Sequence, residues 1–131
     1  MYDKEVYHFI VLHFPIALFI TAYLFDIMCL LLKKDEFNNF VIWLMGFGLF
    51  WSFISILTGY ITAFEMGYLE SISNIFDKKH ANLMILNTGF FTILFIFRNK
   101  NNSNLLFIIH TLCICLLMYG THLGAKWADR I

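Results

Sequence analysis

Four long apolar stretches make up most of this chain, and polar runs separate them. The apolar stretches cover residues 6–32, 40–64, 80–97 and 105–126. Each has roughly the 17 to 25 residues, or slightly more, that a helix needs to cross the hydrocarbon core of a bilayer. The pattern therefore predicts four transmembrane helices within one domain, residues 1–131, and leaves little chain for a soluble domain.

Composition supports a membrane location. The chain is 60% hydrophobic, whereas soluble domains contain about 45 to 50% apolar residues. Its nine basic and nine acidic residues cancel, and all but Asp26 lie at the chain ends and in the connections. This distribution argues against a nucleic-acid partner and against a polybasic lipid-binding face. We expect an all-α integral membrane protein whose surroundings are the lipid bilayer.

The connections predict how the helices are ordered. Residues 33–39 and 98–104 are short and polar, which is typical of tight hairpins between antiparallel helices. Residues 65–79 are longer and half apolar, so we expect this segment to lie along the membrane interface, with an amphipathic turn of helix. The result is an up-down-up-down bundle. Both chain termini and the middle connection share one side, here called the terminal side, and the two hairpins share the other, the hairpin side.

The location in the cell follows from weaker signals. The two hairpins carry basic residues directly at the helix ends, which favours termini outside the cytoplasm. The start, MYDKEVYHF, lacks a net-basic region, so we expect the first helix to stay in the mature protein. A bacterial or organellar inner membrane is the expected location.

Histidines are the strongest chemical signal. His8 and His13 lie near the start of the first apolar stretch, His80 opens the third and His122 lies late in the fourth, so all but His110 gather toward the terminal side. Ionisable residues in membrane spans mostly serve a function. Two imidazoles at one depth can hold haem iron in a six-coordinate, b-type site that favours electron transfer. The first ligand pair we consider is His13 with His80, because the first and third helices run parallel; His122 and then His8 follow. A copper or zinc site built from the same four histidines is the alternative.

Asp26 and His110 form a second possible pair, on the hairpin side. Each lies about six residues from a hairpin, so both should sit roughly 10 Å deep. A carboxylate and an imidazole at one depth in a membrane should pair. We expect this pair to be a structural link between helices, with a proton relay or a quinone site as the alternative role.

Pro15, Gly120 and Gly124 affect how the histidines are presented. Pro15 lies two residues after His13, where it either bends the first helix so that His13 points inward or marks the start of that helix. Gly120 and Gly124 flank His122 and share one helix face. That face allows either close helix packing or the approach of a flat ring.

These residues also resemble a known family. The segment His8-Phe-Ile-Val-Leu-His13-Phe-Pro15-Ile-Ala-Leu is similar to the His-Pro-x-x-Val-His-Phe-Pro-Ile-Ala-Leu opening of the small membrane proteins called domain of unknown function 2231. Later matches are Thr58 with Gly59, His80 at the start of the third helix, and the Gly120 to Gly124 pattern. Phe9 and Leu12 depart from the family's usual proline and valine.

The resemblance implies a four-helix membrane fold that covers nearly the whole chain. Family members are similar to domains fused to c-type cytochromes or Rieske proteins, which implies haem binding or membrane electron transfer. A quinone, a c-type cytochrome or a larger respiratory complex would then be the partner. The resemblance also supports His13 and His80 as ligands, because both match its pattern.

Three functions are compatible with these observations. The first is a b-type cytochrome that holds haem b between two histidines and passes electrons in a respiratory chain. The second is a cofactor-free accessory subunit of a respiratory or transport complex, in which the histidines donate hydrogen bonds between helices. The third is a metal-binding membrane protein. The sequence shows no nucleophile, acid–base pair or nucleotide loop, which favours an electron carrier or subunit over a stand-alone enzyme.

Overall fold

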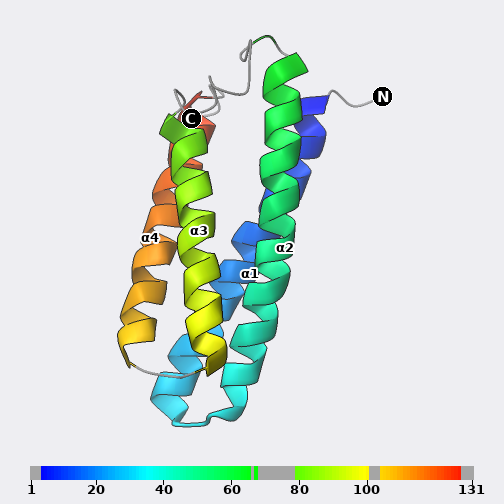
Figure 1. Cartoon of the computed structure of the whole chain (residues 1–131). Coiled ribbons are helices and arrows are strands. Elements are labelled where there is room, and N and C mark those ends of the chain that lie inside the picture. The colour runs from blue at the N-terminus through cyan, green and yellow to red at the C-terminus, as the bar shows by residue number, and fades with distance from the viewer. Residues whose placement is uncertain (1–3, 66, 68–78, 101–103, 128–131) are drawn as a thin grey trace.

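A computed structural model describes residues 4–65, 67, 79–100 and 104–127 of the chain. These residues form the helices α1 (Lys4–Leu32), α2 (Glu36–Glu65), α3 (Lys79–Lys100) and α4 (Asn104–Trp127), shown in Figure 1. All four are long and apolar enough to span a membrane. The predicted all-α membrane bundle is confirmed.

The four helices pack as two antiparallel pairs. The contact between α1 and α2 is the most extensive, followed by that between α3 and α4. In Figure 1, the last turns of α1 and α3 and the first turns of α2 and α4 lie at one end of the bundle, and the opposite ends of these helices lie at the other, as the up-down-up-down order predicts. The two pairs lie closer together at the hairpin end than at the terminal end (Figure 1).

The predicted helix boundaries are too short at the hairpin end. α2 begins at Glu36 rather than near residue 40, and α3 continues to Lys100 rather than 97. The acidic Glu36 lies in the first turn of α2, where a negative charge favours helix formation. Asn38 and Arg98, assigned by sequence to the connections, are therefore helix residues. The interfacial segment expected within residues 65–79 lies almost wholly outside the described residues.

Stacked aromatic rings fill the middle of the core. The rings of Phe19 and Phe91 lie 3.8 Å apart between centroids and are nearly parallel, at 5°. Gly48 on α2 makes room for this stack, because a Cβ atom there would lie 2.7 Å from Cε1 of Phe19. The rest of the buried apolar core consists of Ala22, Val41, Met45, Leu49, Leu94, Leu106, Cys113 and Leu117.

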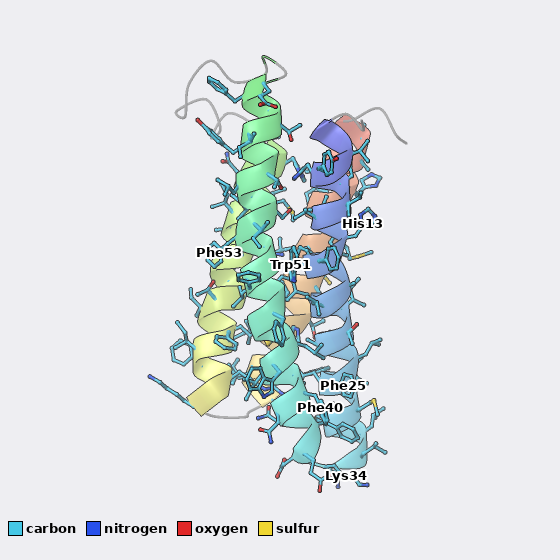
Figure 2. The ribbon with its side chains drawn as sticks, turned by 90° about the vertical axis from the view of Figure 1, so that its right-hand side faces the viewer. His13, Phe25, Lys34, Phe40, Trp51 and Phe53 are labelled. Carbon is cyan, nitrogen blue, oxygen red and sulfur yellow. The ribbon has the colours of Figure 1, made fainter. Side chains whose placement is uncertain are left out.

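Large apolar side chains also cover the outside of the bundle, as a lipid-facing surface requires. Phe53 projects from the outer face of α2 in Figure 2. Phe14 and Trp51 stack across the groove between α1 and α2, with ring centroids 4.6 Å apart. The bundle therefore has an apolar core and an apolar outer surface, as a protein surrounded by lipid does.

Two candidate sites at opposite ends of the bundle

A buried polar cluster joins all four helices near the hairpin end. Each helix contributes one residue, namely Asp26 from α1, Asn38 from α2, Arg98 from α3 and His110 from α4. We call this cluster the polar clamp. The relative exposure of Asp26, Arg98 and His110 is 3%, 2% and 0%, respectively. Charged groups this deeply buried in a membrane protein require partners.

The geometry of the clamp centres on the Asp26 carboxylate. Nη1 of Arg98 donates to Oδ2 of Asp26 at 2.9 Å, and Nη2 of Arg98 pairs with Oδ1. Nε of Arg98 donates to Oδ1 of Asn38 at 2.7 Å. Nδ1 of His110 lies 2.7 Å from Oδ2 of Asp26. The guanidinium thus makes a two-pronged pair with the carboxylate, which fixes orientation as well as charge.

The hydrogen bond to Asp26 also fixes the state of the His110 ring. An ionised carboxylate only accepts hydrogen bonds, so Nδ1 of His110 carries the proton. When the ring is neutral, Nε2 is an acceptor, and this atom is buried without a hydrogen-bond partner among the described residues. Phe91 and Tyr23 pack edge-on against the ring, with centroids 5.9 and 5.2 Å from it. The hydroxyl of Tyr23 bonds to that of Thr111 at 2.9 Å.

The predicted pairing of Asp26 with His110 is confirmed, but sequence reasoning missed Arg98 and Asn38. The run that contains Arg98 was interpreted as a polar connection, with its positive charge exposed at the helix end. One signal in the sequence could have indicated Arg98. A carboxylate in an apolar stretch, such as Asp26, needs a cation at the same depth in the membrane. Arg98 is the basic residue that the second hairpin brings to the level of Asp26.

A pair of histidines lies at the opposite, terminal end. Nδ1 of His8 is 3.1 Å from Oγ1 of Thr58, and that hydroxyl donates its own hydrogen to the Ser55 carbonyl. Nδ1 of His8 therefore donates to Thr58. Nδ1 of His80 lies 2.8 Å from the Gly120 carbonyl, to which it must donate. In each neutral ring the proton is on Nδ1, and Nε2 keeps a lone pair.

Two glycines receive these histidine rings. A Cβ atom at Gly59 would lie 2.8 Å from Cε1 of His8, and one at Gly124 would lie 2.5 Å from Cε1 of His80. The absence of a side chain at these two glycines therefore allows each imidazole ring to lie close to the helix backbone. His8 and His80 come from different helix pairs, yet they lie close enough to interact electrostatically. The structure therefore places these two predicted site residues at the same end of the bundle.

His13 and His122 do not join them, because both side chains are exposed. Figure 2 shows His13 on the outside of α1, where its Nδ1 bonds to the Phe9 carbonyl of its own helix. His8 and His13 are five residues apart, which places them about 140° apart around a helix, so only one can face the interior. The expected pairing of His13 with His80 is not formed in this structure.

Two related expectations are corrected as well. α1 is continuous from Lys4 with Pro15 inside it, so the helix does not begin at the proline, and Pro15 does not turn His13 inward. Within the described part of the chain, no group of three or more His, Cys, Asp or Glu residues is placed to hold a metal ion. The four-histidine metal site is therefore not assembled.

Comparison with known proteins places the chain in a family. A family model described as "Predicted membrane protein (DUF2231)" matches residues 6–131. The chain belongs to this family. The match confirms the resemblance seen in the opening segment and the membrane location. No curated protein and no solved structure matches the chain.

Proposed function

We propose that this DUF2231 protein is a small b-type cytochrome that holds a haem between His8 and His80 at the terminal end of the bundle. The observation that carries the proposal is the anchoring of both imidazoles through Nδ1, one on Thr58 and one on the Gly120 carbonyl. This second bond is the usual way in which a protein orients a metal-ligating histidine and fixes its tautomer. His8 replaces His13 as the preferred partner of His80.

The glycines beside the two rings and the spacing of the helix pairs support this proposal. Gly59 and Gly124 let the edge of each imidazole lie directly against helix backbone. The α1–α2 and α3–α4 pairs are farther apart here than at the hairpin end (Figure 1). A haem held by two imidazoles has no open coordination position, so it favours electron transfer over oxygen chemistry.

The position of the pair also suggests where electrons are exchanged. His80 is the second residue of α3, so it lies within about 3 Å, measured along the helix axis, of the terminal end of that helix. A carrier outside the bundle would meet the site at this end. A quinone, a c-type cytochrome or a larger respiratory complex of a bacterial or organellar inner membrane fits this role, with the termini outside the cytoplasm.

The test is a reduced-minus-oxidised absorbance spectrum of the detergent-purified protein. We expect a b-type spectrum in the wild type and its loss in His8→Ala and in His80→Ala. His13→Ala and His122→Ala are matched controls, because both side chains are exposed, and both should keep the spectrum. Retention of the spectrum in both His8→Ala and His80→Ala would refute the ligand assignment, and a flat wild-type spectrum would refute the haem.

A cofactor-free accessory subunit is the second candidate, and one observation favours it. The bonds from His8 to Thr58 and from His80 to Gly120 each join two helices, as structural histidines do. In that case the purified protein is colourless, and the two alanine variants lower thermal stability without any spectral change. Elemental analysis for iron, copper and zinc separates both candidates from a metal-binding protein.

A further inference from the structure

Two buried acceptors lie in the middle of the bundle without hydrogen-bond partners among the described residues. They are Oδ1 of Asn87 on α3 and Nε2 of His110 on α4. Both residues are buried, at 2% and 0% relative exposure. An unsatisfied polar group in the core of a membrane protein costs free energy. Each of these atoms therefore calls for a donor, and buried water commonly fills this role in proteins.

The Phe19–Phe91 stack lies between these two acceptors. Asn87 is one helical turn before Phe91 on α3, toward the terminal end. His110 packs edge-on against Phe91 and bonds to Asp26, seven residues beyond Phe19 toward the hairpin end. The stack thus separates a polar region on its terminal side from the clamp on its hairpin side.

Further buried polar residues extend the region on the terminal side of the stack. They are Ser52 and Ser55 on α2 and Thr88 on α3. Gly48 contacts Phe19, and the two serines follow it by one and about two turns toward the terminal end. Polar groups therefore occur in the interior between the level of Thr58 and the stack. On the hairpin side of the stack, the next polar group is His110.

We propose that this interior is a proton path whose constriction is the Phe19–Phe91 stack. Water molecules at Asn87 carry the proton on the terminal side. Below the stack, Nε2 of His110 takes up a proton and Nδ1 releases its own to Oδ2 of Asp26. The ring then holds its proton on Nε2, so each further transfer requires the imidazole to turn and exchange its protons with water until Nδ1 again carries the proton. Asp26 then gives the proton to water at the hairpin end. The path does not depend on a haem at the other end.

The groups that face His110 suit this transfer. Asp26 and Tyr23 face it from α1, Arg98 lies behind the carboxylate on α3, and Cys113 lies one turn farther along α4. α2 contributes the neutral Asn38 to this cluster. Arg98 holds Asp26 in the charged form that can receive a proton, and the same pairing makes the carboxyl group release that proton readily.

The full chain reconstituted in phosphatidylcholine vesicles provides the test. A potassium diffusion potential set by valinomycin drives protons inward, and an enclosed pH-sensitive dye reports the rate. We expect Phe91→Ala to raise the wild-type rate by about tenfold or more, which corresponds to a barrier lower by about 1.4 kcal/mol. Phe90→Ala is the matched control, because the neighbouring Phe90 is exposed, and its rate should equal that of the wild type.

A second variant distinguishes a polar path from a simple leak through the cavity. Adding Asn87→Ala to Phe91→Ala removes the acceptor without filling the space left at position 91, and it should return the rate to that of the wild type. Phe91→Leu, a milder change, should give an intermediate rate and covers the case in which Phe91→Ala does not fold. The proposal is overturned if the Phe91 variants match Phe90→Ala, or if the double variant conducts as fast as Phe91→Ala.

Discussion

Removing the charge of Asp26 should destabilise the bundle, because the buried charge of Arg98 then loses its partner. Asp26→Asn keeps the shape of the side chain but leaves the Arg98 guanidinium buried without its carboxylate. Breaking a buried ion pair in this way costs about 3 to 5 kcal/mol. Arg98 is two residues from the end of α3, so its long side chain can reach toward the interface and recover part of that cost. We therefore expect Asp26→Asn to lower the free energy of unfolding by about 3 kcal/mol, near the lower end of this range.

Thermal unfolding in detergent micelles, followed by circular dichroism, measures this effect. A loss of about 3 kcal/mol corresponds to a Tm lower by roughly 10 °C for a chain of this size. Asp35→Asn is the matched control, because Asp35 is an exposed acid in the neighbouring hairpin. The free energy of unfolding of Asp35→Asn should stay within about 0.5 kcal/mol of the wild-type value.

A double variant tests the physical reason. Asp26→Asn combined with Arg98→Gln removes both charges and leaves amides that can still bond to Asn38 and His110. Because no charge is then left buried without a partner, we expect the double variant to recover at least half of the lost stability. A double variant that is less stable than Asp26→Asn alone would show that an unpaired cation is not the cause. An unchanged Tm in Asp26→Asn would refute the clamp as a source of stability.

The glycines give three further predictions. Gly48→Ala should cost about 1 to 3 kcal/mol in thermal unfolding, because its Cβ would meet the ring of Phe19 at 2.7 Å. Gly89→Ala should instead stabilise α3 by up to about 1 kcal/mol, since a Cβ there meets nothing within 4 Å; a lower Tm would contradict the open position. Gly124→Ala should push His80 out of place and lower the haem-to-protein ratio of the purified protein by several-fold, whereas Gly89→Ala should leave that ratio unchanged.

Hydropathy predicted the fold because every helix segment inside the lipid must be apolar. It did not predict the helix ends, because residues at the edge of the bilayer can be polar. The first residues of α2 and the last of α3 are polar, so composition assigned them to the connections. Backbone hydrogen bonding continues the helices through these residues, since polar side chains at the bilayer edge are compatible with a helix. The error mattered, because Asn38 and Arg98 lie in those extra turns and both belong to the clamp.

The histidines show a different limit. Depth along a helix follows from counting residues, and it correctly brought Asp26 to the level of His110. Counting does not give the direction in which a side chain points around the helix axis. That direction determines whether His8 or His13 faces the interior of the bundle. The family pattern favoured His13 as strongly as His80, whereas the glycine opposite each ring was the better guide. Gly59 and Gly124 mark where imidazoles enter the bundle.

The two ends of the bundle differ in which helices their hydrogen bonds connect. At the terminal end, the bonds of His8 and His80 lie within a pair, α1 with α2 and α3 with α4. At the hairpin end, the bonds of the clamp run between the pairs. Separating the pairs at the terminal end would leave both histidines anchored, whereas separating them at the hairpin end would break a buried ion pair. The clamp therefore holds the two helix pairs together, and the proposed haem between His8 and His80 would part the pairs without breaking either histidine bond.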